Sequence, residues 1–197
     1  MYTSPVSLVL GFHGCDKNIG EQVLHGKIRH LRHSENDYDW LGHGIYFWEY
    51  NPERALEFAR ELQTNPRSGK KPIKRPFVLR AVIDPGICLN LLETNSLRLV
   101  RASYELLRKA HETAGIPLPE NKKDSGTGEL LRRNLDCAVI EALHKSHESS
   151  GIRYDTVRGA FLEGSTLYPN SGFHEKNHIQ ICVRNTRCIK GYFRLLP

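Results

Sequence analysis

Residues 44–62 change from a strand-like run to an amphipathic helix within a few positions, and this change strongly constrains the fold. Gly44–Trp48 is a run of bulky residues that is typical of a strand. Asn51 and Pro52 suit the N-cap and the first position of a helix, and Glu53 favours the positive end of its dipole. Apolar side chains then recur at helical spacing, at Ala55, Phe58, Ala59 and Leu62. The segment therefore predicts a helix with one buried stripe.

Short apolar runs and amphipathic segments alternate along the rest of the chain. Strands are predicted over Val6–Phe12, Phe77–Ile83, Tyr154–Leu162, His178–Arg184 and Cys188–Leu195. Helices are predicted over Lys17–Leu24, around the stripe Leu97, Val100, Tyr104 and Leu107, and around Glu129–His147. This order is typical of an α+β fold with a mixed or antiparallel sheet. Residues 1–197 are predicted to form a single domain, with the polar loop at residues 119–128 as the best candidate boundary.

Composition excludes several classes of protein. A chain of 197 residues can bury a core without a covalent staple. Its five cysteines are odd in number and scattered without a CxxC pair, which disfavours a disulfide framework and a zinc site, so no metal is expected. Reduced thiols are typical of the cytosol, and a cytoplasmic location is expected. No apolar run approaches the roughly 18 residues of a membrane helix, and the first residues lack the features of a signal peptide.

Positive charge is partly concentrated in two segments. The formal net charge is +6, and the residues 27–33 and 67–76 carry much of the excess. These segments are either solvated loops or a surface that meets an anionic partner, of which nucleic acid is the commonest. No nucleic-acid-binding motif is present to decide between the two.

Two motifs place chemically useful side chains next to glycines. His13 ends the first predicted strand in the sequence GFHG, where a glycine lets a ligand approach the backbone. Tyr46 lies in GHGIYF, and strand alternation places it on the face opposite Ile45 and Phe47. If those two neighbours face the core, Tyr46 faces a cleft. Taken alone, each pattern is more typical of a structural residue: a histidine at a strand end usually has its polar atoms satisfied, and a strand tyrosine usually satisfies its hydroxyl at an edge.

The last polar pattern lies on a late strand. Alternation over residues 178–183 places Ile179, Ile181 and Val183 on one face, which should be the core face because it is fully apolar. His178 and Gln180 are then displayed together on the accessible face. A polar strand face exposed to water is the alternative.

The order of these motifs resembles the ADP-ribosyltransferase superfamily, and more closely its branch related to diphtheria toxin and poly(ADP-ribose) polymerases, which is built on a His–Tyr–Glu triad. The resemblance covers roughly Leu8–Leu62 and continues more weakly in Phe77–Ile83 and Asp155–Arg194. Residues 93–149 look like a helical insertion. The family's fold is a split, mixed or antiparallel sheet with flanking helices.

The resemblance implies that NAD is the substrate and assigns roles to matching positions. His13 would bind a ribose hydroxyl, the Gly14 backbone would hold the nicotinamide carboxamide, and Tyr46 would stack on the nicotinamide ring. Residues 34–41 occupy the place of the loop that folds over NAD in relatives. Candidate contacts to the dinucleotide from this loop and the following helix are Ser34, Tyr38, Trp40 and, as a substitute for the family's second ring, Phe58. The loop's acidic side chains either cap the loop or pair with the basic residues before it.

Gln180 is the main departure from the family, which usually has a glutamate at this place to stabilise an oxocarbenium-like transition state. A glutamine can bind ribose but supplies no charge, which could slow the reaction about a hundredfold. This argues against polymer synthesis. Glu163 and Glu175 are the alternative sources of a carboxylate, and these residues, with His178, lie where family members recognise the acceptor.

The expected function is mono-ADP-ribosylation of a macromolecule by a bacterial toxin or defence effector in the cytosol. Nucleic acid is favoured over protein as the acceptor, and an antitoxin is a candidate partner; no membrane partner is expected. An NAD glycohydrolase, an RNA 2'-phosphotransferase of related fold and an inactive NAD- or nucleotide-binding module are the alternatives.

Overall fold

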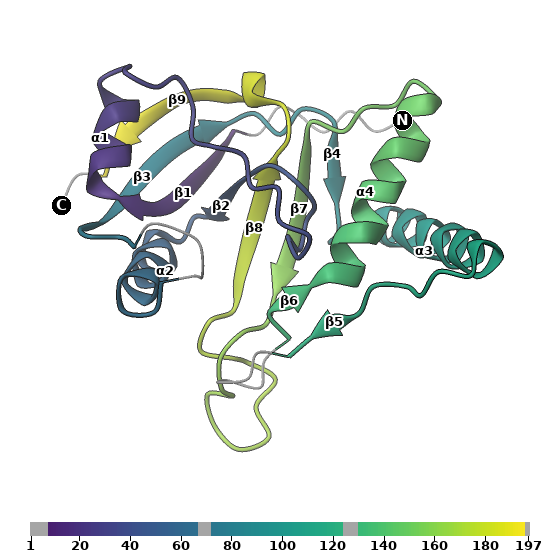
Figure 1. The fold of residues 1–197 in the computed structure, drawn as a ribbon. Helices are drawn as coiled ribbons and strands as arrows, with labels where there is room; N and C mark the ends of the chain where they lie inside the picture. Colours follow the sequence, from purple (N-terminus) through teal and green to yellow (C-terminus); the bar gives the residue numbers. More distant parts are fainter. Residues whose placement is uncertain (1–7, 67–71, 124–129, 196–197) are drawn as a thin grey trace.

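The computed structural model describes residues 8–66, 72–123 and 130–195 and has a seven-stranded sheet at its centre (Figure 1). The strand order is β4-β7-β8-β2-β1-β3-β9. The strands are β1 (Val9–Asp16), β2 (Ile45–Glu49), β3 (Pro76–Ile83), β4 (Cys88–Asn90), β7 (Thr156–Phe161), β8 (His178–Val183) and β9 (Ile189–Arg194). Neighbouring strands pair antiparallel except β4 and β7, which are parallel. The predicted α+β class with a mixed sheet is therefore confirmed.

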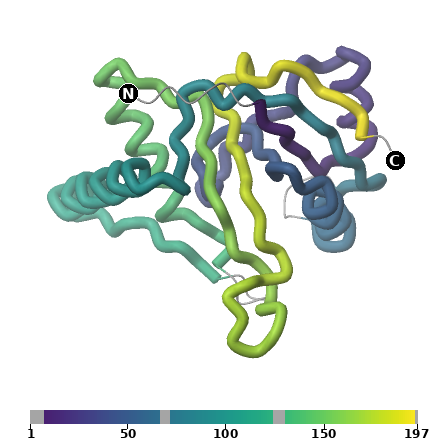
Figure 2. Tube along the Cα trace, turned by 180° about the vertical axis from the view of Figure 1, so that it is seen from behind, coloured from purple at the N-terminus to yellow at the C-terminus, as the bar shows by residue number. Residues whose placement is uncertain are grey.

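Among the described residues, four helices accompany the sheet and two short strands pair beside it. The helices are α1 (Lys17–Leu24), α2 (Pro52–Thr64), α3 (Thr94–Ala114) and α4 (Asn134–Ser149); β5 (Asn121–Lys122) pairs with β6 (Arg132–Arg133), and the 3-10 turn η1 (Thr186–Cys188) precedes β9. Figures 1 and 2 both show the connection between β7 and β8 extending well beyond the sheet.

The strongest sequence predictions match observed elements. Helix α2 begins at Pro52, and the side chain of Asn51 accepts a hydrogen bond from the Arg54 N–H at 3.0 Å. Helix α3 ends before Gly115, whose φ of 66° lies in the left-handed region that favours glycine. The predicted α3 stripe is wrong at Leu97, which is 51% exposed, because α3 packs mainly on α4 and not on the sheet.

Some predicted boundaries lie outside the described residues. These are the start of the first strand at Val6, the start of the last helix at Glu129, and the part of the second basic segment at residues 67–71.

The two faces of the sheet are covered by different elements. On one face, Val23 of α1 packs with the β1 to β3 residues Val9, Phe47 and Leu79. On the other face, Ala55 of α2 packs on Phe12 and Trp48. Further along this second face, α4 contributes Ile140 and Leu143 to a cluster with Leu41, Leu89, Val157 and Cys182. Helix α4, within the segment that looked like an insertion, therefore forms part of the sheet's own core.

Candidate functional site

The candidate site begins where β1 and β2 separate. The two strands pair at Gly11 with Glu49 and at Phe12 with Trp48, and the ladder then ends, whereas β1 stays paired with β3 along its whole length. At the next position, Nδ1 of His13 lies 2.7 Å from the backbone oxygen of Tyr46. The imidazole thus bridges the two strands at the split.

The chemistry of this contact assigns the His13 tautomer. A carbonyl oxygen only accepts, so Nδ1 of His13 carries the proton and donates it to Tyr46. Burial lowers the pKa of His13, although the bond to Tyr46 opposes this, so the ring is neutral at pH 7. Its Nε2 is then an acceptor, with no hydrogen-bond partner among the described residues. A ribose hydroxyl is a matching donor.

Gly14 has a packing role that the sequence did not reveal. A Cβ built on Gly14 would lie 2.0 Å from the backbone oxygen of Ala55, so the close approach at this glycine is made by α2. The ring of His13 lies on the other face of β1, where its centroid is 5.8 Å from that of Phe47.

The hydroxyl of Tyr46 closes the turn that precedes β2. It donates to the oxygen of Gly42 at 2.7 Å and accepts from the N–H of Leu41 at 2.9 Å. The half-buried ring packs against the cluster that contains Leu41 and Cys182, and burial raises the pKa of its hydroxyl well above the usual value. Tyr46 is on the face opposite Phe47, as alternation predicted, and its polar end is already satisfied.

Within the loop at residues 34–44, one acidic side chain holds the backbone together. Asp39 is buried, accepts from the Ser34 hydroxyl at 3.0 Å and from the Asn36 N–H at 2.9 Å. Ser34 also pairs with Gly44 in an isolated bridge. Of the two alternatives for the acidic residues, capping of the loop therefore holds for Asp39. Tyr38 is partly exposed at the loop surface.

Trp40 is held by residues at β6 and at the end of β7. The Trp40 indole donates to the oxygen of Leu131 at 3.0 Å, its ring lies edge-on to Phe161, and the Arg133 guanidinium lies 4.5 Å from the ring centroid. Trp40 is therefore fixed by protein contacts.

Glu141 of α4 holds the turn itself. Its carboxylate accepts from the His43 N–H and from Arg184, both at 2.8 Å. Burial alone would raise the pKa of Glu141, but the His43 N–H and the Arg184 charge together lower it. The loop is thus held in place by α4 and by the residue that follows β8.

Gln180 lies beside Trp48 at the start of β8, and its side-chain nitrogen lies 3.0 Å from Nε2 of His178. His178 was expected on an accessible face, and this was wrong: its side chain is fully buried, between the rings of Trp48 and Phe161. Alternation correctly placed His178 on the face opposite Ile181, but this face is covered by α2 and by Phe161 of β7.

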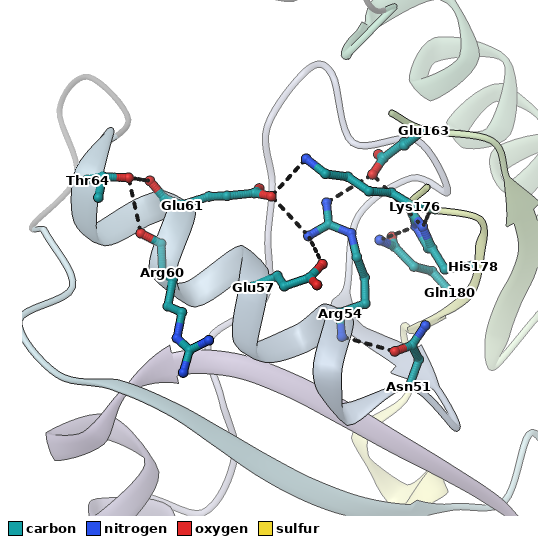
Figure 3. Close-up of polar contacts among 10 residues, drawn as sticks. All are labelled: Asn51, Arg54, Glu57, Arg60, Glu61, Thr64, Glu163, Lys176, His178 and Gln180. Carbon is teal, nitrogen blue, oxygen red and sulfur yellow. Dashed lines mark hydrogen bonds and ion pairs between the residues drawn. The ribbon is translucent and has the colours of Figure 1, made fainter. Parts of the chain in front are cut away.

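Arg54 and Glu163 form a buried ion pair beside His178 (Figure 3). The Arg54 Nη2 lies 3.1 Å from Glu163 Oε2, and their side chains are 7% and 12% exposed. Glu61 accepts from Arg54 at 3.3 Å and from Lys176 at 3.0 Å, so two segments of the β7–β8 connection are tied to α2. Glu163 also lies 3.9 Å from Nδ1 of His178.

Two further predicted site residues, Glu175 and Phe58, lie outside the ion pair of Arg54 and Glu163. Glu175 is exposed, and its carboxylate accepts from the Ser165 N–H at 3.3 Å within the β7–β8 connection. Phe58 packs on Trp48, with ring centroids 4.9 Å apart. The structure thus brings Gln180, His178, Glu163 and Trp48 together, while Glu175 stays in the protruding connection.

Several residues that shape the site were not predicted from the sequence. The main ones are Arg54, Glu141 and Arg184. Arg54 could have been found, because it precedes Phe58 by four positions and therefore shares the helix face that was predicted to be buried. Glu141 and Arg184 carry no local signal, since the turn that they hold is distant in the chain.

Within the described part of the chain, no three His, Cys, Asp or Glu side chains are grouped so that they could hold a metal ion. None of the described helices is long and apolar enough to span a membrane.

Comparison with known proteins finds a distant relative whose description assigns no function. The chain is 24% identical over 198 residues to the "Uncharacterized protein MJ0359" of Methanocaldococcus jannaschii, a match that covers 91% of this chain and 83% of the relative. No family model and no solved structure matches the chain.

Proposed function

We propose that this protein is an NAD-dependent mono-ADP-ribosyltransferase that acts at the split between β1 and β2. The observation that best supports it is the 2.7 Å contact between His13 and Tyr46, which joins two motifs of the family resemblance at the point where their strands part. Gln180, the third position, lies on β8, and the sheet order places β8, β2 and β1 side by side.

The residues present offer hydrogen-bond acceptors on the two faces of the sheet at the split, and NAD has two riboses whose hydroxyls are matching donors. The neutral His13 offers Nε2 as an acceptor for a hydroxyl, and Gln180 offers its side-chain oxygen, since its nitrogen is engaged by His178. The partly exposed Tyr46 is the candidate contact for nicotinamide, while its hydroxyl keeps the turn before β2 in place.

In the proposed reaction, the bond between the nicotinamide nitrogen and C1' of the ribose breaks, and its electron pair leaves with neutral nicotinamide. A lone pair of the acceptor forms the new bond to C1', and the acceptor's proton passes to solvent. The positive charge that develops on the ribose meets the dipole of Gln180 and no full charge. Because Glu163 is already paired with Arg54, it does not replace the missing carboxylate. A slow, single transfer fits these groups better than polymer synthesis.

The test is transfer of label from NAD that carries radioactive phosphate. Purified protein is incubated with a cell lysate, and labelled macromolecules are digested with nuclease or protease; we expect nuclease-sensitive label because the net charge is +6. Gln180→Ala should lose most of the transfer. Gln63→Ala is the matched control, because Gln63 is exposed at the end of α2 and bonds only to the backbone oxygen of Lys74 among the described residues.

Three results would change the assignment. Nicotinamide release without labelled macromolecules would make the protein an NAD glycohydrolase. NAD binding without nicotinamide release would make it a binding module. Absence of NAD binding by calorimetry would overturn the proposal.

A further inference from the structure

A broad open groove of about 740 Å³ lies at the end of the sheet opposite the β7–β8 connection. It is lined by Arg29, His30, Thr186, Arg187, Ile189, Lys190, Gly191 and Tyr192. These residues come from the segment after α1, from η1 and from the start of β9. Figure 1 shows η1 and the β7–β8 connection at the two ends of β8, so the groove is separate from the site at Gln180.

The groove carries positive charge that the described residues neutralise only in part. Arg29 and Arg187 are exposed, and neither guanidinium has a carboxylate partner within the described ranges. Lys190 lies 3.2 Å from Asp84, which compensates one of the three cations. The two arginines belong to different segments of the chain that both line the groove.

His30 lies between these cations and Tyr192 in the lining of the groove. Burial, followed by the charges of Arg29 and His33, lowers the pKa of His30 below its usual value. Its neutral ring lies beside Tyr192, with centroids 5.9 Å apart, and contributes shape to the groove without adding charge.

The wall formed by β9 also offers backbone donors. β9 ends the sheet order and pairs only with β3 among the described strands. Part of the N–H and C=O groups of an edge strand point away from the sheet. A register irregularity occurs where Lys190 lies between the paired residues Ile189 and Gly191. N–H groups and cations together are the usual ligands of phosphate oxygens.

We propose that this groove binds the phosphodiester backbone of a nucleic acid. An open groove with arginines from two segments suits a chain of phosphates better than a single enclosed phosphate. Tyr192 packs against the core beneath the groove, so it is not free to stack on bases, and binding should be independent of base sequence. The binding does not depend on the chemistry at Gln180; if the proposed function holds, the groove would retain a nucleic-acid acceptor.

The experiment measures binding of a fluorescent RNA strand of about 20 nucleotides, and of a DNA duplex of the same length, by anisotropy in the absence of NAD. Affinity is followed between about 50 and 200 mM salt, because each neutralised phosphate contributes about 0.7 to the slope of log affinity against log salt for single strands. Arg29→Ala combined with Arg187→Ala should reduce this slope by about 1.4 and weaken binding about tenfold or more.

A matched variant removes the same charge elsewhere. Arg101 and Lys109 are exposed on α3, far from η1 in Figure 1, and Arg101→Ala combined with Lys109→Ala should leave slope and affinity nearly unchanged. Arg29→Lys combined with Arg187→Lys should keep most of the slope, which separates lost charge from misfolding.

Four results would overturn the groove assignment: no binding of either nucleic acid by the natural sequence, equal losses in both double alanine variants, displacement of RNA by about millimolar pyrophosphate, or equally tight binding of polyglutamate. Nicotinamide release without acceptor is measured on the same variants and should be unchanged by the groove substitutions. Absence of RNA binding by a protein that releases nicotinamide would overturn only the groove assignment. RNA binding without nicotinamide release would leave the groove assignment standing and count against the proposed function.

Discussion

Nε2 of His178 lies 3.0 Å from the side-chain nitrogen of Gln180, and the same ring lies 2.6 Å from the backbone oxygen of Lys176 through Nδ1. Because the oxygen of Lys176 can only accept, Nδ1 holds the proton and Nε2 accepts from the Gln180 amide. These two hydrogen bonds leave the Gln180 side-chain oxygen without a partner among the described residues. His178 therefore acts as a positioning residue that determines which end of the amide a ligand meets.

This orientation should depend on pH. Burial lowers the pKa of His178, with the Lys176 oxygen and Glu163 raising it and Arg54 lowering it further. Protonation below that lowered pKa turns Nε2 into a donor, so Gln180 must turn its oxygen toward His178 and present its NH2 group instead. Nicotinamide release should be constant above about pH 6.5 and fall on acidification.

Removal of the His178 imidazole should abolish the fall in activity at low pH, which we call the acid limb. His178→Phe keeps a ring against Trp48 and Phe161, and should lower kcat about fivefold while NAD affinity changes little, because the amide is no longer held in one orientation. His111→Phe on α3 is the control and should retain the acid limb. An acid limb that persists in His178→Phe would assign the titration to another group.

Tyr46→Phe should destabilise the fold by about 1–3 kcal/mol. Loss of the hydroxyl leaves the N–H of Leu41 and the oxygen of Gly42 without their partner. Urea unfolding measures the loss, and hydrogen exchange should locate it at the amide of Leu41. Tyr38→Phe removes a hydroxyl from the partly exposed part of the same loop and should change stability by less than about 0.5 kcal/mol. Equal effects of the two substitutions would contradict the structural role of the Tyr46 hydroxyl.

Gly14→Ala should cost about 1–3 kcal/mol of unfolding free energy, because the new Cβ meets the backbone oxygen of Ala55 at 2.0 Å and α2 must move. Gly172→Ala is the matched control, since nothing lies within 4 Å of its Cβ position. Both are measured by thermal and urea unfolding. A stable Gly14→Ala variant with unchanged helix α2 would show that the glycine is not required for packing.

Glu163→Ala should destabilise by about 2 kcal/mol, because Arg54 stays buried with only the more exposed Glu57 and Glu61 as partners. Glu175→Ala removes the same charge from an exposed position and should cost less than about 0.5 kcal/mol. Urea unfolding compares the two variants, and a larger loss for Glu175→Ala would reverse our ranking of these carboxylates.

His144 should make the fold sensitive to acid. Burial, with the nearby Arg184, lowers the pKa of His144 to about 4. Between about pH 6.5 and pH 4, His144 is therefore protonated in the unfolded chain and neutral in the folded chain. Stability is therefore fully present above pH 6.5 and is lost toward pH 4, by up to about 3 kcal/mol. His144→Leu should flatten this part of the profile in urea unfolding at about pH 7 and pH 4.5. A profile unchanged by the substitution would place the proton uptake elsewhere.

The order of most helices and strands, and the local chemistry at their ends, can be predicted from the sequence alone. The start of α2 at Pro52, the end of α3 at Gly115 and the alternation around Tyr46 follow from interactions within a few residues, and such signals survive in a single sequence. The same holds for the GFHG and GHGIYF motifs, which single out His13 and Tyr46 without any information about the contact between them.

The enclosure of the site and the orientation of its side chains depend on contacts between residues that are distant in the sequence. Arg54 and Glu163 are 109 positions apart, and the Glu141 carboxylate reaches His43 across 98 positions. The orientation of the Gln180 amide, the burial of His178 and the groove between Arg29 and Arg187 likewise depend on which strands become neighbours. That choice is made by burial of apolar surface summed over the whole sheet, and no short window of the sequence contains it.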